Sequence, residues 1–213
     1  MTQSRDTSTA VPESPTDDAT VDATPLDPAS LADDPGVAFA ERVYPHGDTD
    51  HCEAGAAARA VVGCTRDDGA VLLLVNRDAE HAILPHPTVD DVADLHEAAR
   101  EEVADVAGIA PEAVSIGAPV AVRRVAHYVT DDPDAVGDDT EVEDLAIDVP
   151  DRDPHNVTHH VVLAASLARD GAADLPTPGV DDPDWEAGWF QDLPVEMGAD
   201  AGDVTEDLRR FFD

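Results

Sequence analysis

The chain has no lysine, and its positive charge comes from 12 arginines alone, which face 48 acidic residues for a net charge of −36. No arginine cluster is larger than a pair, so we do not expect binding of DNA or RNA through a basic patch. The acids are scattered along the whole sequence, which is typical of a solvated surface. The simplest cause is adaptation to a very salty cytoplasm, because at about 1 M salt the Debye length is only ~3 Å and self-repulsion is screened.

Cysteines and long apolar runs are also scarce. Cys52 and Cys64 are too few for a disulfide framework. The longest apolar runs, such as "VVLAASLA", fall far short of the ~18 residues that a membrane helix requires. The N-terminus does not show the basic region and apolar stretch of a signal peptide. We therefore expect a soluble, cytoplasmic protein.

Large apolar side chains are almost absent from residues 1–35, which are rich in Thr, Ser, Pro, Asp and Ala. Such a segment buries too little surface to offset its ordering entropy, so we predict a disordered acidic N-terminal tail. A hydrophobic content of 42% argues against disorder of the whole chain. Residues 36–213 are long enough to bury a core and are predicted to form one domain.

Short apolar runs between turn residues predict the strands of that domain. An Asp-Gly turn signal between the first two runs predicts a hairpin. A bend is expected at Gly117–Pro119 in the fourth run, and residues 130–156 are predicted to form an acidic surface loop. The predicted strands cover residues 58–65, 70–76, 82–85, 114–129, 158–168 and 184–194.

Apolar residues at spacings of three and four predict a helix over residues 89–107. Thr88 and Asp91 form a capping pair at its start, and Gly108 is suited to its end. A second, shorter helix is predicted over residues 201–212. One long helix among strands indicates an α/β fold with a mixed β-sheet and helices on its faces.

Two stretches around the first helix resemble the Nudix hydrolase family. In that family a strand ends in Leu-Pro-Gly-Gly, and a helix reads Ala-Ala-x-Arg-Glu-Val-x-Glu-Glu-x-Gly-Ile. Here "ILPHP" (83–87) is similar to the strand end and "AAREEVADVAGI" (98–109) to the helix. "HHVVLAASLA" and "WFQDLP" are similar to later strands of the family. The resemblance covers residues 55–213 and implies a Nudix-type α/β/α sandwich with a mixed sheet.

The resemblance is closer for the apolar positions of the helix than for its polar ones. Counting back from Gly108, the family glutamate at six residues is kept as Glu102, whereas the arginine before it is Glu101. Other signature positions are also replaced: two glutamates by Asp105 and Val106, a loop glutamate by Ala93, and a glycine by Pro87. The signature is therefore degenerate.

The retained acids indicate what chemistry the helix can support. Cleavage of a phosphoanhydride requires cations on the phosphates and an activated water. Mg²⁺ is usually bound by one or two carboxylates together with water and substrate oxygens. Glu102 and Asp105 lie three residues apart, on one helix face, so they are candidate ligands of one Mg²⁺ or Mn²⁺, with Glu102 catalytic. In so acidic a chain, a solvated helix face is the alternative interpretation.

Further site residues follow from the resemblance or from their neighbourhood. Glu186, on a late strand, is a candidate third metal ligand. His86 is a candidate phosphate contact or a filler of the degenerate loop, and Trp185 is a candidate to stack on a base or line the pocket. A transition-metal site is conceivable at His155, His159 and His160, and a zinc site at His46, His51, Cys52 and Cys64, whose spacing fits no common zinc pattern.

Two functional hypotheses remain open from the sequence. The first is a Nudix-family hydrolase that acts weakly on a nucleoside diphosphate linked to another group. The second is a catalytically inactive Nudix-fold domain that binds a nucleotide-like ligand or a protein partner. Fold alone does not decide between them.

Overall fold

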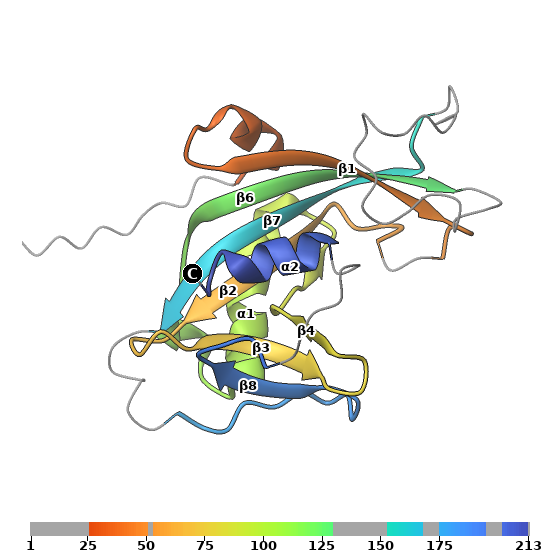
Figure 1. The fold of residues 1–213 in the computed structure, drawn as a ribbon. Helices are drawn as coiled ribbons and strands as arrows, with labels where there is room; N and C mark the ends of the chain where they lie inside the picture. Colours follow the sequence, from red (N-terminus) through yellow and green to blue (C-terminus); the bar gives the residue numbers. More distant parts are fainter. Residues whose placement is uncertain (1–25, 51–52, 130–152, 168–174, 195–201, 213) are drawn as a thin grey trace, which may run out of the picture.

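The computed structural model describes residues 26–50, 53–129, 153–167, 175–194 and 202–212. Within them, eight strands form one mixed sheet, and a helix covers each of its faces (Figure 1). The strands are β1 Ala38–His46, β2 Ala58–Thr65, β3 Val71–Asn76, β4 His81–Ile83, β5 Thr88–Val89, β6 Val114–Val129, β7 Asn156–Leu167 and β8 Glu186–Phe190. The helices are α1 Leu95–Ala107 and α2 Gly202–Arg209, with 3-10 turns at η1 Pro28–Asp33, η2 Val92–Asp94 and η3 Pro111–Ala113.

The sheet has a larger and a smaller part. In the larger part, β1 runs parallel to β6 and β2 parallel to β7, whereas β6 and β7 are antiparallel. In the smaller part, β4 and β8 both pair antiparallel with β3. The parts are joined where β2 pairs with β3, at Thr65 and Val71, beyond which these two strands diverge. Elements from both parts can therefore form the walls of one pocket.

The predicted hairpin is confirmed as β2 and β3. Its turn is closed by hydrogen bonds from Arg66 N–H to Ala70 O and from Gly69 N–H to Arg66 O, both at 2.9 Å. Gly69 has a φ of 83°, which glycine adopts without steric cost. The predicted bend in β6 is also confirmed, because the pairing of β6 with β7 shifts register between Ile116 and Ala121.

Alternation along β2 assigns the two faces of the sheet. Ala58, Ala60 and Val62 pack in the core cluster beneath α1, whereas Val61 packs in the cluster beneath α2. The first cluster includes the fully buried α1 side chains Leu95, Ala99, Val103 and Ala104. Burial of a leucine or valine side chain contributes about 1.5–3 kcal/mol. The predicted α/β class, with a mixed sheet between helices, is confirmed.

The start of the first helix was predicted wrongly. Thr88 and Val89 form β5 against β2, and Ala57 N–H donates to Val89 O at 2.9 Å. The capping pair was wrong for the same reason, because Asp91 instead caps the 3-10 turn η2 by accepting from Ala93 N–H. The predicted end is confirmed, since Gly108 has a φ of 68° and its N–H closes the last turn.

The sequence prediction also missed β1, which pairs with β6 along its whole length. Its sequence, "AFAERVYPH", has no apolar run, and Val43 is its one buried residue. The predicted tail overlaps the described part of the chain at residues 26–35, where η1 forms and Leu31 packs against the core. The rest of that tail and most of the predicted loop 130–156 lie outside the described residues. No described helix is long and apolar enough to cross a membrane.

Candidate functional site

A pocket of about 340 Å³ lies on the α2 side of the sheet, and residues of the larger part, the smaller part and α2 line it. Its volume is at the lower end of the ~300–1,000 Å³ that is usual for small-molecule sites. We call it the central pocket. Its described lining residues are Tyr44, Arg59, Val61, His81, Ile83, Leu84, His86, Arg123, His160, Trp185, Asp203, Val204 and Asp207.

The lining of the central pocket is less acidic than the chain as a whole. Acidic residues outnumber arginines 48 to 12 in the whole sequence. The lining contains two acids, Asp203 and Asp207, against two arginines and three histidines. Both acids are already paired with arginine side chains, as described below. Both lining arginines are paired as well, Arg59 with Glu53 and Arg123 with Asp207, so the pocket lacks the strong negative charge of the rest of the chain.

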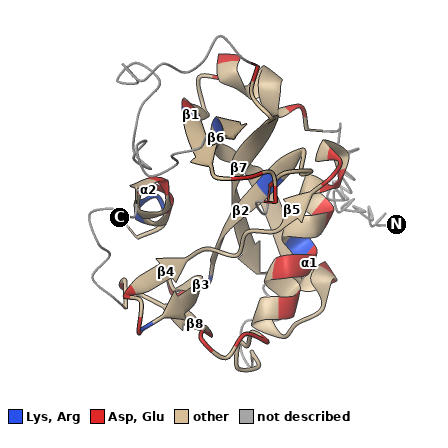
Figure 2. Ribbon diagram, turned by 90° about the vertical axis from the view of Figure 1, so that its right-hand side faces the viewer, with Lys and Arg blue, Asp and Glu red and all other residues tan. Residues whose placement is uncertain are grey.

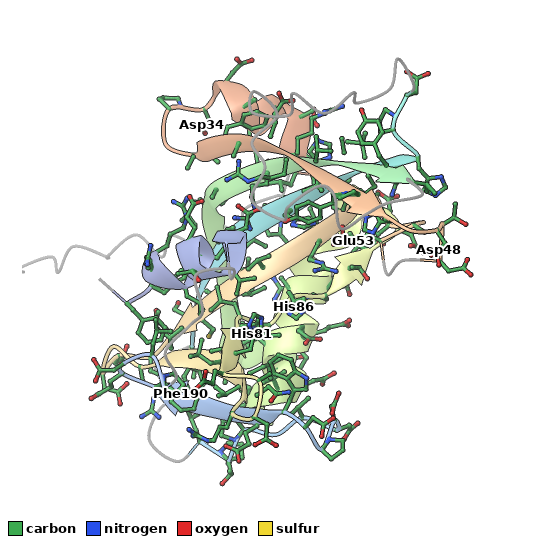
Figure 3. The ribbon with its side chains drawn as sticks, turned by 45° about the vertical axis from the view of Figure 1, so that its right-hand side comes forward. Asp34, Asp48, Glu53, His81, His86 and Phe190 are labelled. Carbon is green, nitrogen blue, oxygen red and sulfur yellow. The ribbon has the colours of Figure 1, made fainter. Side chains whose placement is uncertain are left out.

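The buried carboxylate of Glu53 stands behind one wall of the pocket. Glu53 comes just before β2 in the chain and is 3% exposed. In Figure 3 it lies above the labelled His86 and His81. Oε1 is 2.8 Å from Arg59 Nη2 and 3.0 Å from His160 Nε2. Two of its partners, Arg59 and His160, line the pocket, so Glu53 fixes pocket side chains without lining the pocket itself.

The other oxygen of Glu53 extends this cluster away from the pocket. Oε2 is 3.0 Å from His127 Nε2, and His127 Nδ1 is 2.9 Å from His46 Nε2. Burial would raise the pKa of Glu53, but the contacts with His127, His160 and Arg59 outweigh it and hold the pKa well below its usual range. Because a carboxylate accepts hydrogen bonds, both histidines carry a proton on Nε2 in this arrangement.

Two aspartates fix α2 at the opposite wall. Asp207 forms a two-fold pair with Arg123, in which Nη1 donates to Oδ1 at 2.8 Å and Nη2 donates to Oδ2. Asp203 accepts from Arg42 Nε at 2.9 Å and from Tyr44 Oη at 3.0 Å. Burial opposes the charge of Arg123, but Asp207 outweighs it and raises the pKa. These acids are thus occupied in holding α2 to β1 and β6.

The two residues predicted to contact substrate both line the central pocket. His86 is half-buried, and its Nδ1 donates to Leu84 O at 2.9 Å. Burial lowers the pKa of His86, which leaves Nε2 of the neutral ring as an acceptor. Trp185 is half-buried, and its ring meets the His81 ring edge-on at 6.1 Å between centroids. Their roles stay predictions, although the structure places both at one cavity.

The three predicted metal ligands do not line the central pocket. Glu102 is half-buried, and burial and the neighbouring Asp105 raise its pKa. Asp105 is exposed on the same helix, whose outer face is strongly acidic (Figure 2). Glu186 is exposed on β8 and pairs with Arg77 at 3.0 Å. Among the described residues, no three side chains of the His, Cys, Asp or Glu type are placed to hold a metal together.

The other candidate metal ligands, as far as the structure describes them, do not lie together. His160 enters the pocket wall, whereas His159 alternates away from it on β7, and burial lowers the pKa of His159. Of the four zinc candidates, His51 and Cys52 lie outside the described residues. Cys64 is buried, and burial raises the pKa of its thiol to about 12, so it is not a thiolate at neutral pH.

Sequence reasoning missed the groups that build the pocket wall, foremost Glu53 and Arg59. A signal was present in the apolar strands, where a charged or imidazole side chain interrupts an otherwise apolar run. Arg59 does so in "ARAVVGCT", and Arg123 and His127 do so in "VAVRRVAHYV". Such residues are rarely buried unless paired, so each one points to a buried partner.

Comparison with known proteins gives little further guidance. No family model and no curated protein matches the chain. A solved structure, the crystal structure of Ap4A hydrolase from C. elegans, is similar to 74% of this chain and 99% of its own, at 16% sequence identity and a TM-score of 0.38. A likeness at this level supports no argument about this chain.

Proposed function

We propose that the chain is a Nudix-type hydrolase that slowly cleaves a phosphoanhydride bond in a nucleoside diphosphate linked to another group. The observation that carries the proposal is the placement of Glu102 and Asp105 one turn apart on α1. The Glu102 carboxylate is half-buried, and burial and Asp105 raise its pKa. A raised pKa makes a carboxylate a stronger base toward water than an ordinary one.

The donor set on α1 fits one divalent cation. Glu102 and Asp105 are three residues apart on one helix, and Mg²⁺ or Mn²⁺ takes such oxygen ligands together with water and substrate phosphates. When bound there, the cation would neutralise phosphate charge and lower the pKa of the attacking water. Glu186 would have to leave Arg77 to serve as a further ligand. The short donor set is the reason we expect slow turnover.

In this proposal, residues of the central pocket would hold the nucleoside part of the substrate. Trp185 offers an aromatic surface to a base, and His86 offers an acceptor to a hydroxyl or amino group. The segment from Leu84 to Val89 runs from the pocket, which His86 lines, to the core beneath α1, where Val89 packs. The nucleoside part would lie in the pocket, with the diphosphate directed along this segment toward Glu102.

Release of phosphate or nucleotide from a panel of nucleoside diphosphate derivatives, with Mg²⁺ or Mn²⁺ in multimolar KCl, tests the proposal. We expect slow, metal-dependent turnover that is lost in Glu102→Gln. The matched control is Glu97→Gln, which removes one charge from an exposed position of the same helix. Turnover that survives in Glu102→Gln would place the chemistry elsewhere. No turnover on any compound of the panel would reject the hydrolase.

A binding module without catalysis is the second candidate. One observation favours it: the pocket is well formed, yet none of the carboxylates Glu102, Asp105 and Glu186 lines it. In that case a nucleotide would bind equally well with EDTA present and in Glu102→Gln, and the panel would show no hydrolysis.

A further inference from the structure

We propose that Phe211 and Gly63 are positioning residues of the central pocket: the ring of Phe211 fits against Gly63 and thereby holds α2 in place as the pocket wall. Neither residue is among those that line the pocket, so both act through α2. The inference deepens the proposed function and rests on it, since that proposal places the nucleoside part of the substrate in this pocket.

The first argument is the presence of a glycine in a buried strand. Gly63 interrupts the apolar run of β2, where a glycine weakens the strand and often marks the close approach of another group. Its φ is not positive, so backbone conformation does not explain it. The ring of Phe211 does, because a Cβ on Gly63 would lie 2.1 Å from Cζ and 2.3 Å from Cε1 and Cε2 of that ring. The end of the ring thus occupies the space that any other side chain would need.

The second argument is the location of this contact beside the pocket. Side chains of a strand alternate between its faces, so Arg59, Val61 and Gly63 follow one another on the α2 face of β2. Arg59 and Val61 line the pocket, and Gly63 comes next in this row. Leu208 and Phe211 belong to the same core cluster as Val61, and Figure 1 shows α2 lying over β2. Phe211 therefore meets β2 directly beyond the pocket.

The third argument is that α2 depends on a small number of contacts. It has eight residues, which is too short for a helix to be stable by itself. Asp203 and Asp207 attach it to arginines of β1 and β6, and Leu208 is fully buried beneath it. Phe211 follows the last turn, where its N–H donates to Leu208 O at 3.0 Å. The contact of the Phe211 ring with β2 therefore fixes the C-terminal end of the wall.

A methyl group at position 63 should consequently disturb this wall. Carbon atoms in contact are about 3.5–4.0 Å apart, so the ring must retreat by about 1.5 Å. It either swings away from β2, which releases the end of α2, or carries α2 outward with it. In both cases the pocket opens on its α2 side, whereas α1 packs on the opposite face of the sheet and keeps its place.

Acrylamide quenching of Trp185 fluorescence in multimolar KCl tests the inference without any ligand. Trp185 lines the pocket, and a Trp189→Phe background leaves it as the sole tryptophan of the full chain. In this background Gly63→Ala should raise the quenching constant roughly twofold, because local opening exposes groups that the closed pocket shields. The matched control is Gly179→Ala, since a Cβ on Gly179 meets no atom within 4 Å. Unchanged quenching in folded Gly63→Ala would overturn the proposal.

Two changes of Phe211 show whether the two residues act through each other. Phe211→Ala removes the ring and leaves the sheet intact, so it should raise quenching as well, and it decides the matter if circular dichroism shows that Gly63→Ala does not fold. Phe211→Leu shortens the side chain and makes room for a methyl group at position 63. The double variant Gly63→Ala with Phe211→Leu should therefore be quenched less than Gly63→Ala alone.

The control for the changes of Phe211 is Phe39→Leu, which alters an exposed phenylalanine on β1 and should leave quenching unchanged. Wild-type quenching in Phe211→Ala would overturn the inference. A double variant that is quenched as strongly as folded Gly63→Ala would do so too, because the two residues would then act independently.

Kinetics separate a positioning role from a merely structural one. Phe211→Ala should raise KM for the nucleoside diphosphate derivatives about tenfold and leave kcat unchanged, because the proposed chemistry belongs to α1 on the opposite face. A lower kcat at unchanged KM would contradict a role in positioning the pocket wall. No hydrolysis in the wild type would reject the proposed function, and the quenching of Trp185 would then decide this inference by itself.

Discussion

The Oε1 atom of Glu53 lies 3.0 Å from Nε2 of His160, and this contact joins the loop before β2 to the wall of the central pocket. Both side chains are buried, at 3% and 5% exposure. The same carboxylate also contacts Arg59 and His127. One acid thus ties three strands together, β2, β6 and β7, behind the wall of the central pocket.

Removal of this charge should be costly. Glu53→Gln removes the buried carboxylate that pairs with the mostly buried side chain of Arg59, and breaking a buried ion pair in this way costs about 3–5 kcal/mol. We expect a loss of that order in the free energy of unfolding, measured by urea titration in multimolar KCl. The control is Glu41→Gln, whose exposed pair with Arg124 should be worth less than about 1 kcal/mol. Equal losses in the two variants would contradict a special role for Glu53.

The same residue predicts an acid dependence of stability. The pKa of Glu53 is lowered in the folded chain, so its charge stabilises the fold above the ordinary glutamate pKa of about 4.3. That contribution is lost as the pH falls from there toward the lowered value. The difference in unfolding free energy between wild type and Glu53→Gln should therefore be constant near neutral pH and shrink below about pH 4. A difference that grows on acidification would reverse the assigned sign.

The parts of the fold that were predictable are those encoded locally. The β2–β3 hairpin was predictable from an Asp-Gly turn between two apolar runs. The helix α1 was predictable from its apolar residues at spacings of three and four and from Gly108 at its end. By contrast, β1 gains its strand pairing from β6, far away in sequence, and has no periodic pattern of its own. The predicted start of α1 was wrong for a similar reason: Val89 pairs with β2, although its spacing in the sequence fits the helix.

The site follows the same division. His86 was singled out because it stands at a position of the family pattern, and Trp185 because aromatic residues are few in this chain; both line the pocket. Glu53 carries no such pattern, and its importance depends on burial next to residues from three strands. Sequence order does not reveal which charged residues meet in three dimensions, whereas an isolated arginine or histidine in an apolar strand does reveal that a partner exists.

The structure changes the expected effect of restoring a signature glutamate at Val106. From the sequence alone, Val106→Glu is expected to add a metal ligand. Val106 is 6% exposed and belongs to the core beneath α1, so a carboxylate there is buried without a partner. We now expect Val106→Glu to lower the unfolding free energy by more than about 2 kcal/mol in EDTA.

Val106→Gln, of nearly equal size but uncharged, separates the cost of charge from the cost of shape. If saturating Mg²⁺ restores the stability of the glutamate variant and not of the glutamine variant, the added carboxylate reaches a cation after all. A wild-type stability for Val106→Glu in EDTA would show that this position is less enclosed than the structure indicates.

The final prediction concerns salt, and it follows from the net charge of −36 without any lysine. At about 0.01 M salt the Debye length is ~30 Å, so nearly all surface carboxylates repel one another across the domain. At about 1 M it is ~3 Å, and that repulsion is largely removed. The buried contacts of Glu53 are screened far less and contribute in both conditions. We therefore expect circular dichroism to show loosening or unfolding at low salt and recovery in molar KCl. NaCl at equal ionic strength should act alike if screening is the cause, whereas a folded, unchanged spectrum at ~0.01 M salt would show that the charge is tolerated without it.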